Sequence, residues 1–139
     1  MRETILILED SQARLAALKQ AITSLGPDFC VRVWSDAPRM IAEMDSYLPE
    51  SRLISLDWHL RPVSAAEPGT GYDVMRHLSK RKPVAPVILH SSAILESTIM
   101  RDELRGAGWQ AEQVILMENQ QVATSWLPKA KELLSKAGL

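Results

Sequence analysis

The chain has 139 residues, of which 46% are apolar and 24% charged, and its formal net charge is −1. This length and composition are typical of one compact soluble domain with its own core, and the balanced charge excludes an electrostatic argument for binding nucleic acid or an anionic membrane. The single cysteine, Cys30, cannot form an intramolecular disulfide. The apolar run at residues 5–8 is too short for a signal peptide or a membrane helix, so we expect a reducing, cytoplasmic location.

Short apolar runs alternate with helical patterns along the whole chain. In chain order the pattern predicts a strand over 4–9, a helix over 11–25, a strand over 29–34, a helix between Asp36 and Pro49, a strand over 52–57, a loop over 61–71, a helix over 72–80, a strand over 86–91, a helix over 95–106, a strand over 113–117 and a last helix from near Ser125 to Lys136. The helix over 95–106 is expected to turn Ile99, Met100 and Leu104 inward.

Five alternations of strand and helix predict an α/β fold with a doubly wound, five-stranded parallel sheet and five helices. Because crossovers between parallel strands are right-handed, few strand orders are allowed, and 2-1-3-4-5 is the expected one. The sequence contains neither repeats nor a linker long enough to separate two units. We therefore expect residues 1–139 to form a single domain.

Acid and hydroxyl residues stand where the predicted strands end. Glu9-Asp10 follow the first strand, Asp57 closes the third, and His90-Ser91 close the fourth. In an open parallel sheet, ligands bind at the carboxyl ends of the strands. Carboxylates that converge there need a cation, and Mg²⁺ takes oxygen ligands of this kind. The alternative is that these acids only cap the following helices, with Asp10 as the cap before Ser11.

These residues, in this order and spacing, resemble those of a response-regulator receiver domain. The resemblance covers nearly the whole chain and implies the flavodoxin/CheY-like form of the predicted fold. It implies that Mg²⁺ is held by Glu9, Asp10, Asp57 and the backbone carbonyl of His59. Asp57 would then be the phospho-acceptor, and Ser91 would hydrogen-bond the new phosphoryl group.

The resemblance also implies partners. A histidine kinase or a small phosphodonor would supply the phosphoryl group, and an unknown downstream protein would receive the signal by direct contact. Direct binding of nucleic acid or of a membrane is not expected. Receiver domains often form homodimers, so the resemblance also implies a homodimer as a possible assembly. No output domain is expected after the receiver-like segment.

The end of the fifth strand departs from the receiver pattern. Receivers carry a lysine there, whereas this chain reads Val114 to Asn119 without one, and the nearest lysine is Lys129. Glu118 would make the site more negative if it pointed inward. The aromatic switch residue of receivers is absent too. These departures put signal coupling in doubt, although phosphorylation itself would still be feasible.

A divergent subfamily, the cyclic-phosphate-processing receivers, shares more of the pattern. It resembles this chain in the segment from Gly69 to Val74 and in His90-Ser91, but it carries an acid where this chain has His59. Gly69 and Gly71 stand twelve and fourteen residues after Asp57, farther than in typical receivers, so the loop over 61–71 is expected to overhang the site.

Several side chains keep two interpretations. His90 is either a buried structural histidine or a catalytic acid or hydrogen-bond donor of the site, and His59 offers either its carbonyl or its ring. Ser91 is either a site hydroxyl or a turn hydroxyl. Three functions follow: a stand-alone, self-phosphorylating receiver that is not an enzyme with a separate substrate, a Mg²⁺-dependent phosphoesterase that processes cyclic phosphate ends, and a pseudo-receiver that only binds a partner.

Overall fold

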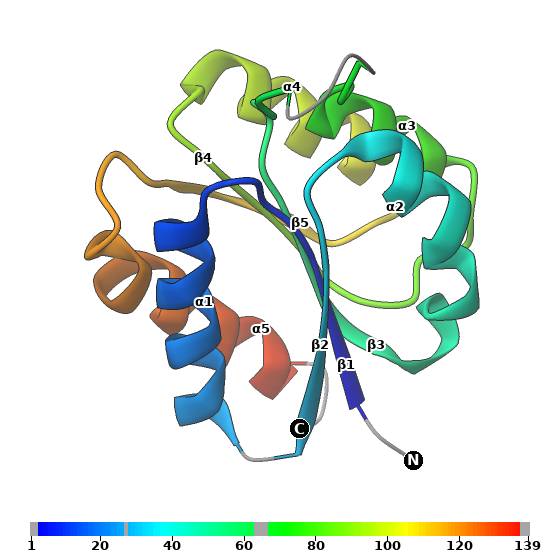
Figure 1. Ribbon diagram of the computed structural model, residues 1–139. Coiled ribbons are helices and arrows are strands. Elements are labelled where there is room, and N and C mark those ends of the chain that lie inside the picture. Colours follow the sequence, from blue (N-terminus) through cyan, green and yellow to red (C-terminus); the bar gives the residue numbers. More distant parts are fainter. Residues whose placement is uncertain (1–2, 27, 63–66, 137–139) are drawn as a thin grey trace.

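The protein folds into three layers, with a parallel sheet between two groups of helices (Figure 1). The structure is a computed structural model that describes residues 3–26, 28–62 and 67–136. The sheet has the strand order β2-β1-β3-β4-β5. Its strands are β1 Glu3–Leu8, β2 Phe29–Trp34, β3 Ser51–Leu56, β4 Val87–Ser91 and β5 Ala111–Ile115. The α-helices are α1 Gln12–Leu25, α2 Ala37–Glu43, α3 Gly71–Ser79, α4 Ile94–Gly106 and α5 Leu127–Lys136.

The alternation of apolar side chains along the strands divides the core between the two faces of the sheet. Ile5 and Ile7 pack with Leu18 of α1 and Leu133 of α5. Residues of the opposite parity, such as Leu6, pack with the layer formed by α2, α3 and α4. Figure 1 shows α1 and α5 together on one side of the sheet and the other three helices on the opposite side. Parity along a strand therefore decides which layer each side chain meets.

Strand register brings the predicted acids to one edge of the sheet. Leu8 of β1 is paired with Leu56 of β3, so Glu9 and Asp57 leave the sheet side by side. Two backbone hydrogen bonds extend this alignment past the strands, since the Asp57 N–H donates to Leu8 O at 3.1 Å and the Glu9 N–H donates to Trp34 O at 3.0 Å.

The predicted fold class, strand order and five helices are confirmed. Strand β5 lies two residues earlier than predicted, because the chain enters it soon after a turn at Gly108, whose φ is +93°. The second helix is shorter than predicted, since two 3₁₀ turns over 44–46 and 48–50 follow α2. A π-helical turn at Val122–Trp126 precedes α5.

One inward-facing residue was predicted wrongly. Met100 and Leu104 are buried in the layer beside α4, as expected, but the side chain of Ile99 is 46% exposed. The apolar stripe on α4 is wider than the face that the sheet covers, so part of it meets solvent. None of the helices in the described part of the chain is long and apolar enough to span a bilayer.

The long loop after β3 returns to the sheet through a close glycine contact. Residues 63–66 of this loop lie outside the described residues, so the predicted overhang is not tested. At its end Gly69 has a φ of +68°, which favours glycine, and Asp73 Oδ2 accepts the N–H of Thr70 at 3.0 Å. The Gly71 N–H donates to Trp58 O at 3.0 Å, and a Cβ on Gly71 would overlap the carbonyl oxygen of Asp57.

Substitution Gly71→Ala should therefore destabilise the protein. Because the obstacle is backbone that cannot rotate away, we expect the free energy of unfolding to fall by about 1–3 kcal/mol. The matched control is Gly106→Ala at the end of α4, where an added Cβ meets nothing within 4 Å. The control should be neutral or stabilising by up to about 1 kcal/mol. Urea unfolding measures both, and equal stabilities for the two variants would contradict the proposed contact.

Candidate functional site

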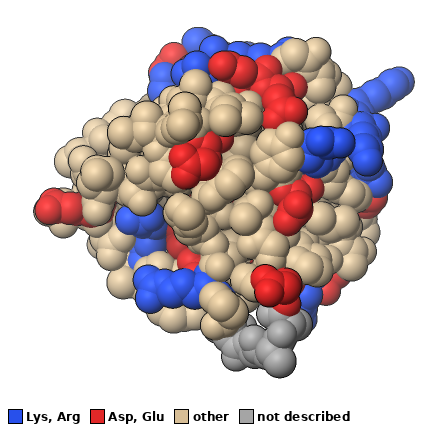
Figure 2. Space-filling view, turned by 90° about the horizontal axis from the view of Figure 1, so that it is seen from above, with Lys and Arg blue, Asp and Glu red and all other residues tan. Residues whose placement is uncertain are grey.

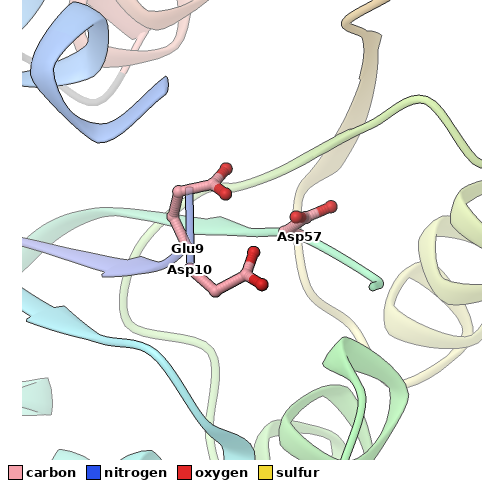
Figure 3. Close-up of side chains that lie close together, drawn as sticks. All are labelled: Glu9, Asp10 and Asp57. Carbon is pink, nitrogen blue, oxygen red and sulfur yellow. The ribbon is translucent and has the colours of Figure 1, made fainter. Parts of the chain in front are cut away.

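Three carboxylates gather at the carboxyl ends of β1 and β3. Glu9, Asp10 and Asp57 each offer an oxygen atom, and these atoms all lie within 4.8 Å of one another. Figure 3 shows the three side chains close together at the ends of the two strands. Glu9 is 2% and Asp57 6% exposed, so two of the three are removed from bulk water. The sequence prediction that these acids meet is confirmed by this geometry.

Each carboxylate also accepts one backbone N–H, which fixes its orientation. Ser11 N donates to Glu9 Oε2 at 3.0 Å, Arg61 N donates to Asp10 Oδ2 at 2.6 Å, and Trp58 N donates to Asp57 Oδ1 at 2.7 Å. Asp10 and Asp57 keep their other oxygen for a ligand, whereas the second oxygen of Glu9 is hydrogen-bonded to His90. Oxygen donors of this kind and number suit a hard divalent cation.

The alternative of simple helix capping does not hold for Asp10. The N-cap of α1 is Ser11, whose Oγ accepts the N–H of Arg14 at 3.3 Å. Asp10 instead reaches across to Arg61 in the loop after β3. Its carboxylate therefore lies with the other two acids rather than over the end of the helix.

The three acids repel one another, and the pKa values of the two buried ones move in opposite directions. Burial raises the pKa of Asp57 to about 6, the charge of Glu9 adds to this, and the positive charges of His90 and Arg14 oppose it. Burial by itself would also raise the pKa of Glu9. The hydrogen bond and charge of His90, with smaller effects from Ser11 and Arg14, outweigh burial, and the pKa of Glu9 is therefore lowered. Glu9 is therefore the acid whose ionised form the fold stabilises. The ionised form of Asp57 is the one that a bound cation would stabilise most.

A chain of buried hydrogen bonds connects Glu9 to the start of α5. His90 Nε2 lies 2.9 Å from Glu9 Oε1, His90 Nδ1 lies 2.5 Å from Ser55 Oγ, and Trp126 Nε1 donates to the same Oγ at 2.9 Å. Glu9 is 2% exposed, and the other three residues are fully buried. Ser55 and His90 both face the layer of α1 and α5, where Trp126 is packed.

The directions of the two outer hydrogen bonds of this chain are fixed. The indole N–H can only donate, so Ser55 Oγ accepts from Trp126 and meets His90 Nδ1 with either its own proton or its second lone pair. An ionised carboxylate can only accept, so His90 Nε2 carries a proton and donates it to Glu9. Both ring nitrogens are engaged, which favours the structural interpretation of His90 over a catalytic acid. Sequence analysis did not assign Ser55 or Trp126 to the site, although a serine inside an apolar strand was a signal for the first.

The remaining predicted residues lie around the cluster. Ser91 is buried at the end of β4, and its Oγ accepts the Ala93 N–H at 3.0 Å, which matches the turn hydroxyl that the sequence left open. The side chain of His59 is exposed, whereas Trp58 is half-buried with its ring centroid 6.0 Å from that of Tyr72. The His59 ring is not among the side chains of the acidic cluster.

No lysine of the described residues takes the place that receivers give to one. The buried Leu116 follows β5, and its N–H donates to Ser91 O at 3.1 Å. Lys129 pairs instead with Glu132 at 3.0 Å and with Glu112 at 3.9 Å. Glu118 is exposed, and its carboxylate accepts a hydrogen bond from Gln120. Its side chain therefore does not point into the site and does not add to the negative charge there.

Comparison with solved structures identifies the fold. The response regulator domain of Thermotoga maritima CheB is 20% identical with a TM-score of 0.69, and the alignment covers 97% of this chain and 98% of that one. The phosphorylated cyanobacterial phytochrome response regulator RcpA is 19% identical with a TM-score of 0.69, covering 98% and 96%. The Mn²⁺-bound form of the response regulator Rcp1 is 17% identical with a TM-score of 0.64, covering 90% and 94%.

These neighbours are response-regulator receiver domains, and the chain has their fold, as the resemblance implied. The sequence itself matches neither a protein-family model nor a curated protein. The likeness is therefore one of structure, at sequence identities too low to carry an activity.

The buried hydrogen-bond chain predicts a large cost for Ser55→Ala. The substitution leaves Trp126 Nε1 and His90 Nδ1 without a partner, and we expect the free energy of unfolding to fall by about 3 kcal/mol. Ser51→Ala is the matched control, since Ser51 is also buried but only donates to Tyr47 O. The control should cost about 1 kcal/mol. Chemical unfolding measures the difference, and equal costs would contradict the proposed role of Ser55.

The raised pKa of Asp57 predicts a pH dependence of stability in metal-free protein. An acid whose pKa is higher in the folded state destabilises that state once it ionises, so stability falls between about pH 4 and pH 7. Asp57→Asn removes this loss. The difference between about 6 and the ordinary value of 3.8 corresponds to roughly 3 kcal/mol.

We therefore expect Asp57→Asn to be more stable than the native protein by up to about 3 kcal/mol at pH 7.5 in EDTA, and equally stable near pH 4. Glu118→Gln, which removes an exposed acid, is the control and should change neither value. Thermal unfolding across this pH range provides the measurement. An advantage of Asp57→Asn that is the same at both pH values would show that it does not arise from ionisation.

Proposed function

We propose that this protein is an atypical response-regulator receiver domain whose Asp57 accepts a phosphoryl group in a Mg²⁺-dependent reaction. The observation that supports this most is the convergence of Glu9, Asp10 and Asp57 within 4.8 Å at the strand ends of a receiver fold. Of the structural neighbours, RcpA is phosphorylated and Rcp1 holds Mn²⁺, which supports both parts of the proposal by analogy.

In this proposal Asp10 and Asp57 hold the ion, with Glu9 and the carbonyl of His59 contributing, directly or through water. The bound ion would neutralise carboxylate and phosphoryl oxygen charge. The Trp58 N–H holds Asp57 Oδ1, which leaves Oδ2 free to attack. The bond from this oxygen to phosphorus forms while the bond from phosphorus to the donor's leaving group breaks. Because its pKa is about 6, Asp57 is mostly ionised, and so nucleophilic, at neutral pH.

We further propose that the signal leaves by contact with another protein. Apolar side chains are exposed on α4 and after β5, namely Ile94 at 58%, Leu95 at 70%, Ile99 at 46% and Met117 at 63%. Ile94 and Leu95 follow soon after Ser91 at the end of β4, and Met117 follows directly after Leu116. Exposed apolar groups of this kind favour protein contact. Figure 2 shows acidic and basic side chains interspersed on the described face seen from above, in keeping with a partner other than nucleic acid.

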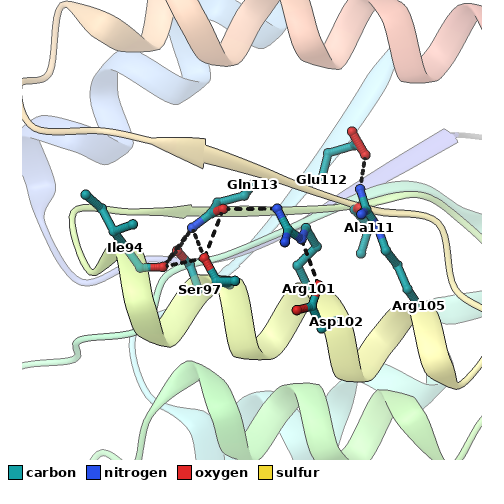
Figure 4. A network of polar contacts seen from close by, with 9 residues as sticks. Ile94, Ser97, Arg101, Asp102, Arg105, Ala111, Glu112 and Gln113 are labelled. Atoms are coloured by element: carbon teal, nitrogen blue, oxygen red, sulfur yellow. Dashed lines mark hydrogen bonds and ion pairs between the residues drawn. The ribbon is translucent and has the colours of Figure 1, made fainter.

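A polar network also joins α4 to β5, the strand that lacks the aromatic switch residue of receivers. Gln113 of β5 donates to Ile94 O at 2.8 Å and to Ser97 Oγ at 2.6 Å, and it accepts from Arg101 at 3.4 Å (Figure 4). This network joins the first turns of α4 to the sheet. We propose that it transmits a change at the strand ends to the exposed apolar residues of α4.

The two alternatives have less support. A phosphoesterase would use His90 or His59 as a general acid. Both ring nitrogens of His90 are hydrogen-bonded within the fold, and the exposed ring of His59 is not part of the acidic cluster. A pseudo-receiver with remnant acids would have no need to hold each carboxylate with a backbone donor, as this chain does. A histidine kinase or a small phosphodonor remains the proposed source of phosphoryl groups, and the proposed location is the cytoplasm.

The proposal predicts that acetyl phosphate labels the protein in a Mg²⁺-dependent manner. Labelling should require millimolar Mg²⁺, stop in EDTA, and be abolished by Asp57→Asn, because that side chain supplies the attacking oxygen. Glu118→Gln should label like the native protein, since that acid is exposed. Phosphate-affinity gel electrophoresis and intact mass measure the product.

The alternatives are separated by two further outcomes. If calorimetry shows Mg²⁺ binding but labelling fails with acetyl phosphate and with beryllofluoride, the receiver function is wrong. If Mg²⁺ does not bind at all, a partner-binding pseudo-receiver accounts for the chain better. Turnover of a cyclic phosphate that is lost in Asp57→Asn would support the phosphoesterase instead.

A further inference from the structure

We propose that Arg14 is the cation that contacts the phosphoryl group on Asp57 and thereby replaces the lysine missing after β5. The inference rests on the proposed function and names a residue of the same site that neither the sequence pattern nor the family resemblance singles out. It follows from the charge of the cluster, the anchoring of Arg14 and the donors that its side chain leaves free.

The first argument is the charge of the loaded site. Three carboxylates carry three negative charges, a divalent cation removes two, and a phosphoryl group adds more. A buried anion of this size needs a further positive charge. Receivers meet the need with a lysine after the fifth strand, but here the buried Leu116 occupies this region. Another basic residue has to serve if Asp57 is phosphorylated.

Hydrogen bonds hold the side chain of Arg14 at the segment after β5, where receivers carry their lysine. It lies in the first turn of α1, directly after the Glu9-Asp10 pair, and is half-buried. Its Nη2 donates to Leu116 O at 3.3 Å, and its Nε donates to Asn119 Oδ1 at 3.2 Å. Helix α1 thus brings a guanidinium group to the end of β5, and these two hydrogen bonds keep it there.

The other basic groups near the acids are less suited than Arg14 to contact a phosphoryl group. His90 is fully occupied by Glu9 and Ser55, so it has no proton to offer a phosphoryl oxygen. The side chain of Arg61 is 85% exposed and lies 4.0 Å from Asp10, where water screens its charge.

Arg14 also keeps donors for an anion. A guanidinium group has five N–H bonds in a planar fork, and the two anchoring hydrogen bonds engage only part of them. The remaining N–H groups suit phosphoryl oxygens, which arginine binds at two points. Because the anchors lie in the segment between β5 and the π-helical turn, a shift of Arg14 towards the phosphoryl group would act on that segment directly.

The test uses beryllofluoride as the phosphoryl analogue and the full chain. Affinities for Mg²⁺ alone and for beryllofluoride in saturating Mg²⁺ are measured by tryptophan fluorescence and calorimetry, for the native protein and for Arg14→Gln, Arg14→Lys and Arg61→Gln. Arg14→Gln should lose about tenfold to hundredfold in beryllofluoride affinity, the range expected for a charge-assisted hydrogen bond. Its Mg²⁺ affinity should stay equal or rise, because a repelling positive charge is gone.

The other variants separate charge from packing. Arg14→Lys should keep most of the beryllofluoride affinity, and it provides the test if Arg14→Gln fails to fold. Arg61→Gln, the matched control, should bind beryllofluoride like the native protein. Native-like affinity in Arg14→Gln, an equal loss in Arg61→Gln, or a parallel loss of Mg²⁺ affinity would overturn the role of Arg14. If the native protein binds Mg²⁺ but not beryllofluoride, the proposed phospho-acceptor function fails, and this inference fails with it.

Discussion

The repulsion between three carboxylates confined to one edge of a sheet is the constraint on which the rest of this site depends. Glu9 and Asp57 are nearly sealed from water, where like charges repel most strongly. The fold responds with a backbone donor for each acid and with a buried histidine against Glu9. What is left uncompensated is Asp57, and this is the residue whose pKa is raised. We therefore expect a bound cation to stabilise this site.

The same constraint explains why the interior on the side of α1 and α5 contains polar groups. A histidine beside Glu9 needs an acceptor or donor for its second nitrogen, and Ser55 provides it. The serine in turn is completed by the indole of Trp126, where the chain forms a π-helical turn before α5. Glu9 is in this way linked through the core to an element far from the strand ends. Helical irregularities of this kind are often found at functional sites.

Two polar contacts lie near the carboxyl end of β5, where this chain departs from the receiver pattern. Arg14 reaches Leu116 and Asn119 from α1, and Gln113 joins β5 to α4 where an aromatic residue is absent. Both replacements are polar contacts across the carboxyl end of the sheet. The contact of Gln113 includes Ile94, one of the exposed apolar residues of the surface proposed for a partner.

Much of this protein was determined by local sequence. The period of apolar residues gave the strand and helix order, and apolar runs that end in acid residues indicated the site, because parallel strands bring their carboxyl ends to one edge. Patterns of this kind act through neighbours in the chain and can be read from it. Tertiary structure alone decided the exposure of Ile99, the cap at Ser11 and the hydrogen-bond chain. Ser55 lies 35 residues before His90 and 71 residues before Trp126. Only strand register and helix packing bring residues so far apart in the chain together.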